Sequence, residues 1–336
     1  EIAGCLVLST NPALSMPDTP FVRKALDSLE FLVVLDPFMS ETAEMADVVL
    51  PSAIWVEDEG TVTNLEGRML KINPAAEPPG EARPDWWILR EIARRLGRGE
   101  FFQYDSPQEI FEELRVATKG GRADYSGLTW EKIESRNGEV FEPCVSDEDS
   151  GESQLFKERF AHPDGKARFI PAPHRPPAEE PNDEFPFYLT NGRFLFQYLT
   201  GNQTRRIESL NGQAPYAFVE INQREAERLR ITNGTVVRVR TPRGSVEVKA
   251  SIVNTIRPDT LFLPMHYPGV AGVNQVTNPV VEPSVSIPEF KVAAATIEPV
   301  SAPVEPGGQA TEHYSPETDP AMYPYITGDT NTGVKG

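Results

Sequence analysis

The hydrophobic pattern of this chain changes at about residue 185, and the change limits the folds open to it. Before that point, short apolar runs such as AGCLVLST and FLVVL alternate with helical patterns, of which PDWWILREIARRLG is the clearest. Pro84 near the start of that segment and Gly97 at its end are typical helix boundaries. Strands that alternate with helices predict an α/β fold with a parallel, Rossmann-like sheet.

The pattern after residue 185 is that of a β domain. Five short apolar runs are separated by turn signals: FYLTNG, YAFVEIN, TVVRVRT, GSVEVKASIV and DTLFLPM. The TPRG sequence between two of them is typical of a hairpin, and the helical pattern QREAERLR interrupts the series. We therefore expect a compact β-barrel domain.

The remaining segments set the expected domain boundaries. An acidic stretch, VSDEDSGES, and a Pro-rich run separate the two patterns, and the last residues are rich in Pro, Gly, Thr and Glu without periodicity. We predict an α/β part over residues 1–100, an insertion and linker over 101–184, a barrel domain over 185–300 and an extended or disordered tail over 301–336. Because EIAGCLVLST resembles a buried strand rather than a leader, we expect the chain to begin within the fold of a longer protein.

Composition excludes several functional classes. Among the 336 residues, 50 acidic and 32 basic side chains give a net charge of −18, which disfavours nucleic acid as a partner. No apolar run approaches the length of a membrane span. Cys5 and Cys144 lie far apart, with no CxxC or Cys/His cluster, so the sequence predicts no disulfide framework, zinc site or iron–sulfur motif. The cysteines fit a reducing compartment.

Polar residues at strand ends are the first candidates for a binding site. Asn11 and Asp36 each follow an apolar run, and open α/β sheets bind nucleotides beyond the carboxyl ends of their strands. Because no GxGxxG motif accompanies them, turn capping is an equally good interpretation. The charged segment VEDEGTVTNLEGR is predicted to be a loop, and a solvated loop without function is the simpler interpretation of it.

The β half offers a second set of candidates. Arg193 and the Arg205–Arg206 pair follow the first β run, and arginine binds phosphate through two parallel hydrogen bonds. His266 lies in a Gly- and Asn-rich loop, and Lys291 precedes the run VAAATIEPV. A lone histidine after an apolar strand is more often a structural residue than a ligand-binding one, so a structural role is the simpler interpretation of His266 taken by itself.

Several long motifs, in order, then point to a family. TNP, VVLDPFMSETAEMADVVLPSAIWVEDEGTVTNLEGR and PPGEARPDWWIL, followed by TNGRFLFQYLTGNQTRR and VNQVTNPVVEPSVSIPEFK, resemble the dimethyl sulfoxide reductase family of molybdenum enzymes, over about residues 3–300. Within this family the motifs are most similar to those of assimilatory nitrate reductase catalytic subunits, and formate dehydrogenase alpha subunits share nearly all of them.

The resemblance implies a cofactor and a set of binding residues. The cofactor is bis-molybdopterin guanine dinucleotide, and the β domain would be a double-psi-type barrel. A [4Fe–4S] cluster and the molybdenum ligand are expected upstream of this chain, so no catalytic residue is expected within it. The implied cofactor-binding residues are Asn11, Leu35, Asp36, Asp58, Asp85, Asn191, Gly192, Arg193, Phe194, Leu195, Gln197, Tyr198, Thr200, His266, Asn274 and Lys291. Two sites depart from the family pattern: QYLTG stands where a WHT-type sequence is frequent, and Asp58 where lysine is common.

Three functional hypotheses follow from the resemblance. The first is a cytoplasmic nitrate reductase, which transfers an oxygen atom from nitrate at molybdenum and receives electrons from ferredoxin, flavodoxin or an NADH-linked partner. The second is a formate dehydrogenase alpha subunit, which oxidises formate to carbon dioxide on the same scaffold. The third is a non-catalytic split subunit that closes over a cofactor supplied by a partner chain.

Overall fold

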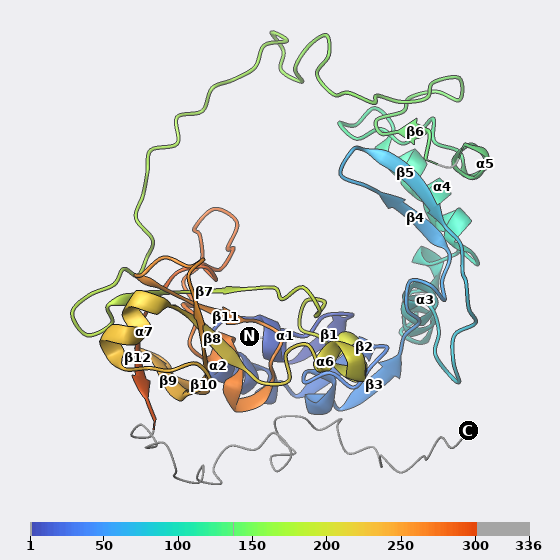
Figure 1. Ribbon diagram of the computed structural model, residues 1–336. Coiled ribbons are helices and arrows are strands. Elements are labelled where there is room, and N and C mark those ends of the chain that lie inside the picture. Colours follow the sequence, from blue (N-terminus) through green and yellow to red (C-terminus); the bar gives the residue numbers. More distant parts are fainter. Residues whose placement is uncertain (1, 137, 301–336) are drawn as a thin grey trace, which may run out of the picture. The chain divides into compact units, whose positions relative to one another are not determined.

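The computed structural model describes residues 2–136 and 138–300, which divide into two units (Figure 1). The tail predicted for residues 301–336 lies outside the described residues. One unit, called the barrel unit below, comprises residues 2–34, 38–48 and 174–300. The other, the hairpin unit, comprises residues 35–37 and 49–173.

The first strands form the predicted α/β sheet. Strands β1 (Gly4–Leu8), β2 (Phe31–Asp36) and β3 (Val48–Pro51) are paired in the order β1-β2-β3. Helices α1 (Pro12–Ser15) and α2 (Thr19–Asp27) connect β1 to β2, and such a crossover is what joins neighbouring parallel strands. The predicted short helix before β3 is a single 3-10 turn, η1 (Ala43–Met45).

A closed barrel contains the larger hydrophobic core. Its strands are β7 (Phe187–Gly192), β8 (Phe218–Asn222), β9 (Val236–Thr241), β10 (Gly244–Val253), β11 (Thr260–Pro264) and β12 (Ala293–Pro299), closed in the order β10-β8-β11-β7-β12-β9. Alternate residues point inward, and Leu189, Val219, Val239 and Leu261 are fully buried there. The β-barrel predicted from the sequence is confirmed.

Local sequence explains the connections of the barrel. The TPRG hairpin joins β9 to β10, with Gly244 opposite Thr241. Asn222 caps α7 (Gln223–Leu229) by accepting a hydrogen bond from the Arg224 backbone N–H. Shorter helical turns lie between the strands: η3 (Thr204–Arg206), α6 (Glu208–Asn211), η4 (Gly269–Ala271) and η5 (Val273–Gln275).

Two barrel strands end at the same edge. Strands β7 and β11 pair in parallel, with Leu263 opposite Asn191 and Pro264 opposite Gly192. A Cβ atom on Gly192 would lie 2.6 Å from the Phe262 ring, so the close approach of the two strands requires glycine at this position. The chain leaves both strands at this edge, where most of the candidate residues of the β half lie.

The hairpin unit is built on a small antiparallel sheet. Its strands are β4 (Gly60–Thr63), β5 (Arg68–Ile72) and β6 (Val140–Phe141), in the order β4-β5-β6. Its helical segments are α3 (Asp85–Arg95), η2 (Gly99–Phe101), α4 (Pro107–Thr118) and α5 (Trp130–Ser135). The prediction of a loop for VEDEGTVTNLEGR was wrong in part. Its TVT segment pairs with β5 because Asn64 and Gly67 form a tight turn between the two strands.

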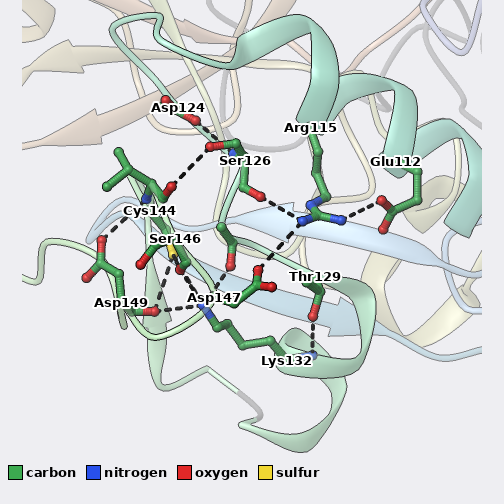
Figure 2. Close-up of polar contacts among 12 residues, drawn as sticks. Glu112, Arg115, Asp124, Ser126, Thr129, Lys132, Cys144, Ser146, Asp147 and Asp149 are labelled. Carbon is green, nitrogen blue, oxygen red and sulfur yellow. Dashed lines mark hydrogen bonds and ion pairs between the residues drawn. The ribbon is translucent and has the colours of Figure 1, made fainter.

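A buried lysine joins the loops of the hairpin unit. The Lys132 ammonium donates hydrogen bonds to the backbone oxygens of Gly127 at 2.6 Å, Ser146 at 2.9 Å and Asp149 at 2.7 Å (Figure 2). The Sγ atom of the fully buried Cys144 lies 3.6 Å from the same nitrogen. This one side chain therefore satisfies three carbonyl groups, one at Gly127 and two in the turn of residues 146–149.

Candidate cofactor-binding site

A chain of polar side chains lies along the carboxyl-end edge of β7 and β11. The Lys291 ammonium donates to the backbone oxygen of Asn191 at 2.6 Å and to its Oδ1 at 2.9 Å. The Asn191 amide donates to Asn274 Oδ1 at 3.1 Å, and the Asn274 amide donates to the Leu14 backbone oxygen at 2.9 Å. Three of the residues predicted from the sequence are thus directly linked, and they are joined to helix α1.

This edge carries positive charge without a compensating acid. Burial lowers the pKa of Lys291, and the nearby charge of Arg193 lowers it further. Within the part of the chain that the structure describes, no carboxylate forms an ion pair with Lys291 or Arg193. Two neighbouring cations of this kind favour an anionic ligand such as a phosphate group.

His266 is buried against the segment that follows β7, and its ring has unused hydrogen-bonding capacity. Only 2% of the residue is exposed, and its ring stacks on Phe194 at a centroid distance of 5.8 Å and lies against Tyr267 at 4.0 Å. Among the described residues neither ring nitrogen has a hydrogen-bond partner. Burial, assisted by the charge of Arg205, lowers the pKa of His266 to about 3. The ring is therefore neutral at pH 7 and can donate one hydrogen bond and accept another.

The segment that follows β7 divides into anchoring and exposed residues. The Gln197 side chain donates to Asn211 Oδ1 at 3.0 Å and accepts from Thr204 Oγ1 at 2.6 Å, so it holds the segment to α6 and η3. The Thr200 backbone oxygen accepts from Arg205 Nε at 3.0 Å. By contrast, the side chains of Leu195 and Tyr198 are largely exposed.

Asn11 belongs to a buried network that the sequence did not indicate. Its amide nitrogen donates to Glu41 Oε2 at 2.6 Å, and its amide oxygen accepts from Thr42 Oγ1 at 2.8 Å and from the Thr42 backbone N–H at 3.2 Å. Arg205, predicted as a possible phosphate ligand, instead pairs with Glu41 Oε1 at 2.7 Å. Sequence analysis missed Glu41 because an acidic residue in a polar segment carries no signal of burial.

The other four predicted residues lie in the hairpin unit. Leu35 and Asp36 are buried at the end of β2, and Asp85 is the first residue of α3, directly after Pro84. Burial raises the pKa of Asp58, and its Oδ1 accepts a hydrogen bond from the Glu59 backbone N–H at 2.8 Å. These carboxyl groups can accept hydrogen bonds from N–H and O–H groups of a ligand.

The donor set of the barrel edge fits a dinucleotide better than it fits a bare metal. A guanine dinucleotide offers a pyrophosphate to Lys291 and Arg193, and polar ring and ribose groups to the unsatisfied nitrogens of His266. No group of three or more His, Cys, Asp or Glu side chains that could hold a metal ion occurs among residues 2–136 and 138–300. Within the same residues, no helix is both long and apolar enough to cross a bilayer.

Comparison with known proteins identifies relatives of this chain. The relatives include the assimilatory nitrate reductase catalytic subunit of Bacillus subtilis, 41% identical over 89% of this chain and 42% of the relative. They also include the F420-dependent formate dehydrogenase subunit alpha of Methanocaldococcus jannaschii, 40% identical over 87% of this chain and 42% of the relative. The chain thus spans less than half the length of these two proteins.

A solved structure shares the fold. Acetylene hydratase from Pelobacter acetylenicus superposes with a TM-score of 0.69 at 18% identity, over 88% of this chain and 44% of that one. Residues 1–95 match the family model for molybdopterin oxidoreductase, and residues 187–294 match that for the molydopterin dinucleotide binding domain. The two models together cover more than half of the sequence. The chain therefore belongs to the molybdopterin oxidoreductase family.

Proposed function

We propose that this chain forms part of the cofactor cradle of a molybdenum oxidoreductase that reduces nitrate to nitrite. The observation that carries the proposal is the barrel edge, where Lys291 is bonded to Asn191, two residues before Arg193, and neither cation has a carboxylate partner among the described residues. The barrel would be of the double-psi type, an assignment supported by its two parallel pairs, β7 with β11 and β8 with β10. We propose bis-molybdopterin guanine dinucleotide as the ligand, held by the sixteen residues predicted from the sequence.

Each part of the chain would have a separate task. Lys291 and Arg193 would bind the pyrophosphate, and His266 would bind a polar group through its neutral ring. Asp36 and Asp85 would accept hydrogen bonds from the guanine and ribose. The bound group supplies oxygen-atom transfer and two-electron chemistry, while the protein orients it and limits access of water. A [4Fe–4S] cluster would be held by a part of the parent protein that lies upstream of Glu1.

The substrate that we propose is nitrate. Nitrate is favoured by the relative at 41% identity, and formate is the second candidate because a formate dehydrogenase subunit matches at 40%. Ferredoxin, flavodoxin or an NADH-linked subunit would supply electrons, and we propose a cytoplasmic location. A non-catalytic subunit that only closes over the cofactor is the alternative from another class.

A paired assay separates the two substrates. The full-length parent protein would be supplied with reduced viologen and nitrate, and the same preparation would be tested for formate oxidation with oxidised viologen. Nitrite formation without formate oxidation is expected. Formate oxidation alone would replace the nitrate assignment with the formate one. Neither activity in a preparation with full molybdenum content would contradict both substrates.

The binding roles are tested by cofactor content. We expect Lys291→Ala and Asp36→Ala in the parent protein to lose molybdenum and guanine nucleotide in proportion to activity. Lys249→Ala, on the barrel strand β10, is the matched control for Lys291. Full cofactor content in both site variants would contradict the assigned roles.

A further inference from the structure

A buried acid that belongs to none of the predicted binding residues connects three segments of the barrel unit. Glu41 lies in the segment of residues 38–48, and the exposed fraction of its side chain is only 9%. One carboxylate oxygen accepts from the Asn11 amide at 2.6 Å, and the other accepts from Arg205 at 2.7 Å. A single carboxylate thus joins residues 30 and 164 positions away in the sequence.

The buried ion pair between Glu41 and Arg205 adds little net stability to the fold. Removing two charges from water carries a desolvation penalty that their attraction offsets only in good geometry, and an apolar pair of similar volume is often equally stable. Burial by itself raises the pKa of Glu41, but Arg205 and Asn11 outweigh it, so the pKa lies below its usual value and the group is charged at pH 7. The pair is therefore better explained by what it positions than by the stability it adds.

The groups held by Glu41 are those that border the candidate site. Arg205 also donates to the Thr200 backbone oxygen at 3.0 Å, which fixes the segment after β7. Burial lowers the pKa of His266, and the charge of Arg205 adds to this effect, so the ring is neutral at pH 7. Asn11 lies between β1 and helix α1, directly before Pro12, and its position is set by Glu41 and Thr42 together.

We propose that Glu41 is a positioning residue for the dinucleotide, which acts through Arg205 and Asn11 to hold the segments of residues 9–12 and 197–206 in the arrangement that the ligand requires. It touches no part of the ligand itself. With the carboxylate in place, Arg205 is committed to Glu41 and Thr200, which leaves Lys291 and Arg193 as the phosphate ligands. This inference rests on the proposed function, since it assigns a role toward the same ligand.

The test compares Glu41→Gln with Glu179→Gln in the full-length parent protein. Glu179 also forms an ion pair within the barrel unit, with Arg243 at 2.9 Å, but neither Asn11 nor Arg205 contacts it. For each variant the folded, monodisperse fraction is isolated, and guanine nucleotide and molybdenum per chain are measured after acid release. Melting temperature is recorded in parallel. We expect Glu41→Gln to retain about tenfold less nucleotide than wild type, and Glu179→Gln to retain the wild-type amount.

A double variant separates positioning from simple stability. Glu41→Met with Arg205→Met removes both charges and replaces them with unbranched apolar side chains, a change that buried ion pairs often tolerate without loss of stability. If Glu41 positions the ligand, this variant has the melting temperature of wild type but still retains about tenfold less nucleotide. Wild-type nucleotide content in the folded double variant, or in Glu41→Gln, would overturn the inference while leaving the proposed function in place. Wild-type protein that carries no guanine nucleotide at all would overturn the proposed function and the inference with it.

Discussion

Replacement of Lys132 by methionine tests how a buried cation holds the hairpin unit together. Methionine retains most of the aliphatic stem but removes the ammonium, which donates to the backbone oxygens of Gly127, Ser146 and Asp149 (Figure 2). Only 8% of Lys132 is exposed, so water does not readily replace the lost donors. A hydrogen bond from a charged donor contributes about 1.5 kcal/mol or more net of desolvation. Three such bonds, less the gain from burying a methionine, give an expected loss of about 3–4 kcal/mol.

Local hydrogen exchange is the appropriate assay, because a chain with two units need not unfold in one step. A loss of about 3 kcal/mol corresponds to more than about 100-fold faster exchange of the amides that open with these loops. We expect the acceleration in peptides that cover residues 124–151, together with a lower urea midpoint for the fluorescence of Trp130, which packs in the same core.

The same substitution at an exposed lysine is the control. Lys157 lies in the hairpin unit with its side chain in solvent. Lys157→Met should therefore change the free energy of unfolding by less than about 0.5 kcal/mol. If Lys132→Met and Lys157→Met show the same exchange rates and urea midpoints, the ammonium does not stabilise the loops, and the reasoning from its three contacts is refuted.

Three further predictions concern His266, Gly192 and Cys144. The pKa of His266 is about 3 in the folded protein, against an ordinary value of 6.5. Between these two pH values the unfolded chain binds a proton at this residue that the folded chain does not. The free energy of unfolding should therefore fall by about 1.4 kcal/mol per pH unit as the pH drops below 6.5 toward 3. His266→Gln should lack this component in urea titrations at pH 7.0 and 5.5, and equal slopes for the two proteins would contradict it. Gly192→Ala should lower the free energy of unfolding by about 1–3 kcal/mol, measured in thermal melts, because the new methyl group meets the Phe262 ring. Gly244→Ala is the control, since the space around Gly244 is open. Equal melting temperatures for the two variants would show that the Phe262 ring moves freely. Cys144 is fully buried, and burial raises the pKa of its thiol. Iodoacetamide should therefore label the half-buried Cys5 before Cys144, which peptide mass spectrometry would detect. Equal labelling rates would argue against the burial of Cys144.

Periodicity gave reliable predictions wherever a segment packs one face against a core. The alternation of YAFVEIN, TVVRVRT and GSVEVKASIV corresponds to β8, β9 and β10, and the pattern of PDWWILREIARRLG to α3. The failure at VEDEGTVTNLEGR has a clear cause. Its charged residues suggested a solvated loop, but the pairing of β4 with β5 depends on a partner strand and on the turn at Asn64, neither of which composition reports.

The amino-acid sequence by itself determined the family, the order of the α/β and barrel segments, and the types of side chain that a dinucleotide would need. Only the tertiary structure decided which of these side chains are free to act. Gln197 is committed to Asn211 and Thr204, whereas His266 has two nitrogens without partners among the described residues. Glu41 was not predicted, because the burial of a carboxylate depends on a guanidinium 164 residues away. A residue type records what a group can bind, but burial and the partners already bound are set by contacts between segments that the linear sequence does not bring together.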